Sequence, residues 1–499
     1  MIEPPSMTAV LSGALVALFV GSLTNTIVGI ALPTIAGELG GQDQVAWVAS
    51  AALLTMTVST PLWGKGADRR GPKPLLLAAL GVFEAGSLVA GFAPSMGVLI
   101  VGRGLQGAGA GGILTLTNTL VAELVPARDR GRYTSWFGVS FGVASVAGPL
   151  VGGLIVGVPW LGWRWCFLGV VPLTLLAAVL VWRAPNRVPS GSRGRVDFMG
   201  GTLFAAAATG LVVLLSASGR AWPWLSTTTI AFGSGVLVIG ALGLLRERRA
   251  PDPMLPPRLF RSPTFTVACA TSFLLGAVMF GGIIYLPQYL QVVRGHDATT
   301  AGLLMLPQIG TMIVASMLSG RLVARTGRWK VFPVAGCGLL VAGLLMLYRL
   351  EPDTAHWRLA AGMALLGAGT GLTQQVLVLV AQNSVGAADL GVASSTATFS
   401  RTLGGAVGVA AFGAMITSRL HADLPSALAS AGFAADDGAL RTLLGTPERI
   451  AALPGSLADA VRTSYTAGLG SVFLVALPLA SLALVSVLCT RETPLSTQH

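Results

Sequence analysis

Three ionisable residues, Glu84, Arg103 and Arg401, interrupt long apolar stretches of the sequence. A charged side chain in such a stretch is costly in a bilayer and indicates a functional role by default. Glu84 and Arg103 fall in neighbouring stretches joined by a short turn, which places them at similar depth. We therefore predict that Glu84 carries a proton and that Arg103 is coupled to it. Two other interpretations stay open: Glu84 in a static ion pair, and Arg103 reaching the outer headgroups along its own side chain.

Uncharged polar residues also interrupt these stretches, and amides are prominent among them. Amides inside a membrane can hydrogen-bond a substrate in a cavity, or they can bond neighbouring helices. The sequence alone does not choose between the two. The residues that we expect to line a substrate cavity are Asn25, Asn118, Gln308, Gln374, Gln375 and Arg401.

Other kinds of chemistry find no support in the sequence. The four cysteines lie inside apolar stretches without CxxC spacing, and the four histidines are scattered. We therefore expect neither a metal site nor a disulfide framework. The run GAGAGG from Gly107 lies inside an apolar stretch with no strand before it, which excludes a dinucleotide-binding fingerprint. No nucleophile or phosphate-binding loop stands out, and we expect no cofactor and no enzymatic activity.

The apolar stretches themselves define the class of protein. Of the 499 residues, 53% are hydrophobic and 10% are charged, and the mean hydropathy is +0.75, whereas a soluble protein carries about 25% charged residues. A helix needs roughly 20 apolar residues to cross a bilayer. We predict an all-α integral membrane protein with fourteen transmembrane helices, near residues 8–32, 45–64, 75–93, 96–124, 133–157, 163–182, 198–216, 226–245, 264–291, 301–320, 331–349, 357–382, 393–418 and 466–488.

The net charge of +12 lies mainly in the loops between these stretches. If the N-terminus lies in the cytoplasm, most Lys and Arg residues fall in the inner loops, as the positive-inside rule requires. We therefore predict a multi-pass protein of the inner or plasma membrane with both termini in the cytoplasm. This topological explanation needs no nucleic-acid partner.

Three short motifs occur twice, in the same order and at nearly the same separation. This repetition predicts two parallel six-helix halves. The predicted domains are an N-terminal bundle (1–188), a linker with two extra transmembrane helices (189–262), and a C-terminal bundle (263–499) with a long extracytoplasmic loop at about 419–465. The matching positions are Gly64 and Gly320, Gly71 and Gly327, Pro33 and Pro287, and Gly107 and Gly367.

The run GKGADRRGPK after the second span resembles the signature loop of the major facilitator superfamily. Glycine permits tight turns between the helices, and Asp68 can bond a basic neighbour or sit at a helix N-terminus of the opposite half. Such a contact would hold a cytoplasmic gate shut. In the second half, Ala324 stands where the first has Asp68. The gating residues that the resemblance implies are Gly64, Asp68, Arg69, Gly71 and Lys73.

Other segments resemble the fourteen-span drug:proton antiporter family within this superfamily. They include WLGWRWCFLGVVPL from Trp160, FSRTLGGAVG with Arg401, and LIVGRGLQGAGAGG with Arg103. In this family the arginine of the last segment tunes proton binding and release, and the resemblance implies the same role for Arg103. The fifth span carries AGPLVGG, similar to the antiporter motif of drug exporters. We expect its small residues to let the helix cross tightly against the other half, and its proline to kink it. These motif residues are Gly148, Pro149, Gly152 and Gly153.

One departure from the family concerns proton coupling. The first span reads LTNTIVGIALP, with Thr24 where the family has an acid and Gly29 where it has Asn. Neither Thr24 nor Asn25 carries a proton near neutral pH, so Glu84 is our candidate to replace the missing acid.

The resemblance implies a monomeric secondary active exporter that works by alternating access. It would exchange amphipathic drugs or antibiotics for protons, and its partners are small lipophilic substrates, protons and membrane lipids. The alternative functions are an exporter or flippase of lipids or of a dedicated natural product, and a non-transporting membrane sensor.

Overall fold

The computed structural model describes residues 7–40, 44–158, 161–183, 198–218, 222–223, 225–430, 455–492 and 494–495. Within these ranges the regular secondary structure is helical, apart from one isolated bridge between Ser218 and Trp222. Helix is the expected result for apolar segments in lipid, because every backbone polar group is then satisfied inside its own segment.

The first half contains six membrane-spanning segments, the last of which is broken into two helices. They are α1 (Met7–Leu39), α2 (Val45–Arg70), α3 (Pro72–Gly91), α4 (Met96–Leu124), α5 (Ala127–Gly157), and α6 (Trp165–Leu168) with α7 (Val171–Trp182). The extra pair consists of α8 (Phe198–Ala217) and α9 (Thr227–Arg249).

The second half follows a short 3-10 turn, η2 (Leu259–Arg261), and again has six spans. They are α10 (Pro263–Val292), α11 (Ala298–Leu304) with α12 (Leu306–Thr326), α13 (Val331–Leu347), α14 (His356–Asn383), α15 (Leu390–Ser430), preceded by the turn η3 (Ala387–Asp389), and α18 (Gly455–Cys489).

The predicted spans coincide with these helices. Eleven helices of the described chain are long and apolar enough to cross a membrane. The other three predicted spans correspond to α2 and to the shorter apolar helices at Met199–Leu215 and Val331–Leu347. The boundaries differ most at the predicted loop 419–465, since α15 continues to Ser430 and α18 begins at Gly455. The residues between these two helices lie outside the described ranges.

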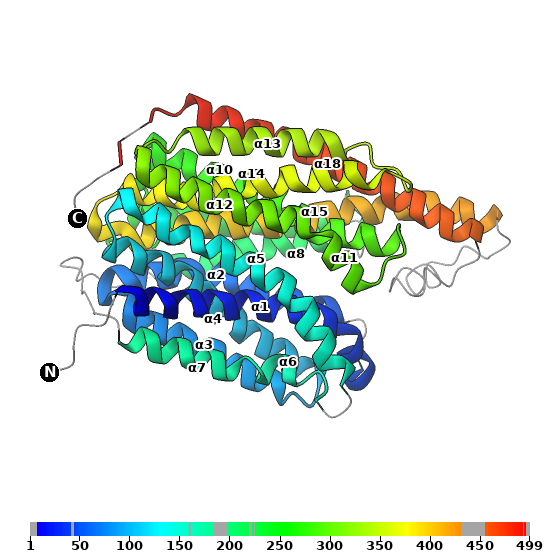
Figure 1. Ribbon diagram of the computed structural model, residues 1–499, viewed down its shortest axis with the longest axis horizontal. Helices are drawn as coiled ribbons and strands as arrows, with labels where there is room; N and C mark the ends of the chain where they lie inside the picture. The colour runs from blue at the N-terminus through cyan, green and yellow to red at the C-terminus, as the bar shows by residue number, and fades with distance from the viewer. Residues whose placement is uncertain are drawn as a thin grey trace.

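The two halves pack along each other with their helices roughly parallel (Figure 1). Contacts between the halves pair α2 with α15 and α5 with α12. Each half has its own apolar core, with Phe83 and Leu116 in the first and Leu286 and Phe473 in the second. The extra helix α8 packs on α9, α2 and α15, so the extra pair covers the junction between the halves.

Two matching glycines of the repeat have the same local role. Gly71 (φ 81°) ends α2 and Gly327 (φ 69°) ends α12, and each donates its backbone N–H to a carbonyl of the preceding turn, Ala67 and Val323 respectively. A positive φ is accessible to glycine without steric cost. The repeated glycines therefore reflect a repeated helix ending.

Candidate functional site: a closed gate and a central cavity

Asp68 connects the two halves at the end of the bundle where α1 begins and α18 ends, which we call the termini end (Figure 1). Its carboxylate accepts hydrogen bonds from the backbone N–H groups of Gly391 (2.6 Å) and Val392 (2.8 Å), in the first turn of α15. The side chain is 7% exposed. An anion at a helix N-terminus satisfies unpaired N–H groups and the helix dipole. This is the second of the two arrangements that the sequence allows for Asp68.

Gly64 has a different role from the one predicted. The predicted loop is almost entirely helical, because α2 continues to Arg70 and α3 begins at Pro72. Gly71 makes the turn, but Gly64 lies inside α2, where a Cβ atom would lie 2.1 Å from the Ser395 hydroxyl oxygen of α15. Gly64 therefore permits close contact between the halves instead of a turn.

A second contact between the halves lies at the same end and has the opposite polarity. The Arg128 guanidinium, at the start of α5, donates to the backbone carbonyls of Ala324 (3.1 Å) and Arg325 (3.2 Å), in the last turn of α12. A cation at a helix C-terminus is the electrostatic counterpart of Asp68 at an N-terminus. Close by, a Cβ atom on Gly320 would lie 2.0 Å from the Gly131 carbonyl oxygen, so the two helices meet backbone to backbone.

Two basic residues of the motif bind the segment that follows the extra pair of helices. Lys65 and Arg69 both donate to the carboxylate of Asp252, which follows α9. Burial alone would raise the pKa of Asp252, but the hydrogen bonds and charges of Lys65 and Arg69 outweigh it, and the pKa lies below its usual value. Lys73 instead lies over the Trp182 ring, 5.9 Å from its centroid. The linker after the extra pair is thus tied to the gate motif.

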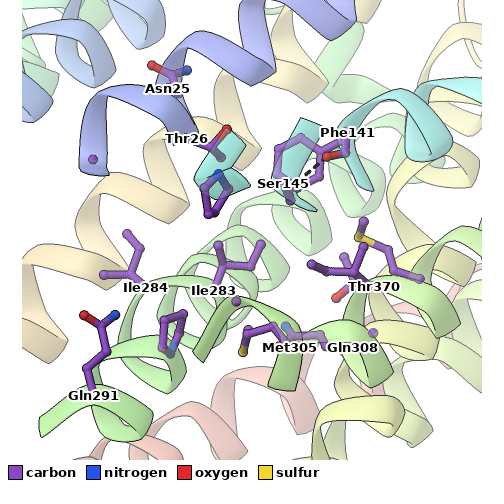
Figure 2. Close-up of a pocket in the computed structure, with 17 residues that line it drawn as sticks. Asn25, Thr26, Phe141, Ser145, Ile283, Ile284, Gln291, Met305, Gln308 and Thr370 are labelled. Atoms are coloured by element: carbon purple, nitrogen blue, oxygen red, sulfur yellow. Dashed lines mark hydrogen bonds between the residues drawn. The ribbon is translucent and has the colours of Figure 1, made fainter. Parts of the chain in front are cut away.

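A central cavity of about 320 Å³ lies between the halves, farther from the termini end. Figure 2 shows side chains of α1 and α5 facing those of α10, α12 and α14. Gln291, near the far end of α10, marks its outer part, and Gln308 and Thr370 lie deeper along the wall. Its polar groups are amides and hydroxyls, and every lining residue is uncharged. The arrangement suits a mainly apolar ligand with a few hydrogen-bonding groups.

Arg103 is held by neutral partners on three helices. Its guanidinium donates to the Val48 carbonyl (3.2 Å), to Gln106 (2.8 Å) and to the side-chain oxygen of Asn25 (2.9 Å), and Arg103 is 3% exposed. Asn25 also lines the central cavity. The structure therefore excludes snorkelling of Arg103 and connects this residue to the cavity through one amide.

Glu84 lies apart from Arg103. It faces α7 near Thr174, whose hydroxyl donates to the Val170 carbonyl (3.0 Å). Both carboxylate oxygens of Glu84 are buried, with the Thr174 hydroxyl as their polar neighbour, and none of the ion pairs among the described residues joins Glu84 to Arg103. The structure does not bring the two predicted proton-coupling residues into direct contact.

Two glycines of the antiporter motif pack inside their own half. A Cβ atom on Gly148 would lie 2.0 Å from the Thr26 hydroxyl oxygen of α1, and one on Gly152 would lie 3.3 Å from the Ile27 carbonyl. Gly153 has no neighbour within 4 Å, whereas Pro149 lines the cavity. As predicted, α5 crosses closely against the other half, but the glycines that approach α12 lie earlier in α5 than this motif, at Gly131, Gly138 and Gly142.

The predicted cavity residues fall into three groups. Asn25 and Gln308 line the central cavity, and Gln374 and Arg401 line a small side pocket. Asn118 and Gln375 are buried elsewhere and each keeps an oxygen without a hydrogen-bond partner. Several cavity residues carry no signal in the sequence, because hydroxyls, Met and Ile are common in any span. Ser145, Ile283 and Gln291 each lie four residues from a cavity proline, Pro149 or Pro287, and this spacing is the signal that could have found them. The cavity residues not predicted include Thr26, Ser145, Ile283, Gln291, Met305 and Thr370.

Comparison with known proteins agrees with this architecture. The chain is 36% identical over 500 residues to an uncharacterised MFS-type transporter, Rv1877, of Mycobacterium tuberculosis, covering 100% of this chain and 72% of the relative. It is 31% identical over 511 residues to the multidrug transporter protein MdtP of Bacillus subtilis, covering 98% and 94%.

Among solved structures, the proton:xylose symporter XylE superposes with a TM-score of 0.64 at 13% identity, covering 96% of this chain and 94% of that one. Such low identity supports the fold alone. Residues 14–409 match the family described as the Major Facilitator Superfamily. With this match and two six-helix halves around a cavity, the chain belongs to the Major Facilitator Superfamily, a family of membrane transporters and not of enzymes.

Proposed function

We propose that this transporter is an exporter of amphipathic drugs or antibiotics, driven by protons that move in the opposite direction. The observation that carries the proposal is a mainly apolar cavity, bounded by both halves, whose termini end is closed by Asp68 and Arg128. The similarity to a relative named as a multidrug transporter supports the substrate class. The protein works as a monomer in the cell membrane, since one chain bounds the whole cavity.

The concentration of basic residues in alternate loops supports a cytoplasmic termini end. In that orientation the structure is closed toward the cytoplasm, and its cavity lies nearer the outer face. Export then requires the Asp68 and Arg128 contacts to break, so that the halves rock around the central site and admit substrate from the inside.

Proton coupling is assigned to Glu84. Arg103 is the charged residue through which substrate in the cavity would affect the helices of the first half. Glu84 has a buried carboxyl that joins none of the ion pairs among the described residues, and a site that binds and releases a proton needs a titratable group that no fixed cation neutralises. Arg103 reaches the cavity through Asn25. Coupling between the two would pass through the packing of α3 on α4.

Proteoliposomes with an imposed pH gradient test this proposal. Addition of lipophilic drugs should release protons from vesicles that contain the wild-type protein, and Glu84→Gln should abolish the release while drug binding persists. Asp129→Asn, which removes an exposed carboxylate at the termini end, is the matched control and should behave as wild type. Unchanged release with Glu84→Gln would refute the assignment of Glu84, and absence of release with every drug would refute drug:proton exchange.

A further inference from the structure

Arg401 is a buried cation for which the described protein supplies no partner. It is 7% exposed and lies on α15, and its guanidinium takes part in none of the side-chain hydrogen bonds or ion pairs found among the described residues. The other buried arginines differ: Arg103 has three acceptors, and Arg130 donates to the carbonyls of Val125 (2.8 Å) and Ala122 (2.6 Å). Leaving a guanidinium unpaired inside a membrane protein is costly, and such residues mark ligand or ion pathways.

Arg401 lines a side pocket that adjoins the central cavity. The pocket has room for about one water-sized group, about 20 Å³. Thr370 belongs to the walls of both spaces, so the side pocket with Arg401 lies beside the central cavity. The pocket thus fits one oxygen of a larger ligand, and not a whole second ligand.

Arg401 is the principal hydrogen-bond donor of this pocket, because most of its other polar groups already donate elsewhere. The hydroxyls of Ser272, Thr370 and Thr373 already donate to carbonyls of their own helices, at 2.7, 2.8 and 2.9 Å. They offer lone pairs and no free proton. Gln374, the remaining polar neighbour, has an amide that can donate beside Arg401.

The residues around the central cavity supply no negative charge to oppose Arg401. Every residue that lines the central cavity is uncharged, so the cavity wall provides no carboxylate to neutralise Arg401 or to attract a cationic drug. The second guanidinium in the region, on Arg103, is held behind Asn25 by neutral groups only. A low-dielectric pocket that holds an unneutralised positive charge favours an anion.

We infer that Arg401, assisted by Gln374, binds the anionic group of the transported molecule while its apolar part occupies the central cavity. The substrates are then amphipathic organic acids that carry one carboxylate or a similar anionic oxygen. The assignment rests on the proposed function in that it takes the central cavity as the substrate site. A guanidinium fork forms short, charge-assisted hydrogen bonds with such a group.

A matched pair of probes tests this inference. Pyrenebutyrate and its neutral amide have the same aromatic body, and their binding to the purified protein in detergent can be followed by pyrene fluorescence. The wild-type protein should prefer the acid by about 10-fold or more, which is the strength of a charge-assisted hydrogen bond. Arg401→Gln should remove the preference and leave amide binding within about twofold, and Arg401→Lys should retain part of it.

Two further variants test the site without removing its guanidinium and test the effect of removing a positive charge elsewhere. Thr370→Ile enlarges the side chain that the walls of both spaces share and keeps the guanidinium, so the acid preference should fall as it does in Arg401→Gln. Arg462→Gln, which removes a partly exposed arginine near the start of α18, should leave the preference intact. An equal affinity of the wild-type protein for the two probes, or a preference that persists in Arg401→Gln and Thr370→Ile, would overturn the inference.

Transport of the same probes in proteoliposomes separates this inference from the proposed function. Export of the amide without any acid preference would refute the anion subsite and leave the exporter standing. An Arg401-dependent preference in binding, with no transport of either probe, would support the subsite and refute export.

Discussion

Removal of the Asp68 charge should open the termini end of the transporter. Asp68→Asn loses one of the two acceptors for the N–H groups of Gly391 and Val392 and turns the other into a neutral hydrogen bond. Charge-assisted bonds contribute about 1.5–3 kcal/mol each against about 0.5–1.5 for neutral ones, and an anion at a helix N-terminus adds about 0.3–2 kcal/mol. Together these terms destabilise the closed state by about 3–6 kcal/mol, or about 10²- to 10⁴-fold in the ratio of closed to open molecules.

Spin labels across the gate can measure this ratio. Arg132 on α5 and Arg321 on α12 are exposed residues of opposite halves near the termini end, and Arg132→Cys with Arg321→Cys provides the label sites once the four native cysteines are replaced. Double electron–electron resonance should show a single short distance in the parent protein and a large population at longer distance in Asp68→Asn.

The matched control is Asp129→Asn, at the same end of the bundle but exposed to solvent. Its distance distribution should equal that of the parent. If Asp68→Asn also leaves the distribution unchanged, the carboxylate does not hold the gate, and closure must come from the backbone contacts between α5 and α12.

Three further changes have distinct expected outcomes. Gly320→Ala places a Cβ atom 2.0 Å from a carbonyl oxygen of the opposite half and should weaken gate closure and slow transport, whereas Gly310→Ala, on the same helix with open space around it, should not. Gly148→Ala places a Cβ atom 2.0 Å from the Thr26 hydroxyl oxygen of α1 and should lower both thermal stability and transport, whereas Gly153→Ala should behave nearly as wild type. Equal effects of the two variants in either pair would contradict the packing argument. Asp252→Asn should lower the unfolding free energy by about 1–3 kcal/mol. The folded-state pKa of Asp252 lies below the usual 3.8, so the charged form stabilises the fold above that value. The difference in melting temperature between the wild-type protein and Asp252→Asn should therefore stay constant from about pH 5 to 8 and shrink below about pH 4. A difference that vanishes near pH 7 would show that another group is responsible.

The order and number of membrane spans follow from the sequence because the bilayer imposes a length and an apolar composition on each span. The repeat of Gly71 at Gly327 likewise revealed two equivalent halves, since a positive φ at a helix end requires glycine wherever it occurs. The motif around Asp68 limited its partners to a basic neighbour or a helix N-terminus of the opposite half, because the residue type and its place at a span end restrict what it can bind, and the structure shows the second.

Only the tertiary structure decided which side chains meet, because contacts between distant helices depend on their rotation and depth, and hydropathy does not encode either. Glu84 and Arg103 have similar predicted depth, yet one faces α7 and the other reaches Asn25 on α1. Gly148 was expected against the opposite half and packs on α1 of its own half. The unpaired state of Arg401 is likewise visible only once its neighbours on α10 and α14 are in place, since the sequence shows a charge in a span but not whether that span brings a partner to it.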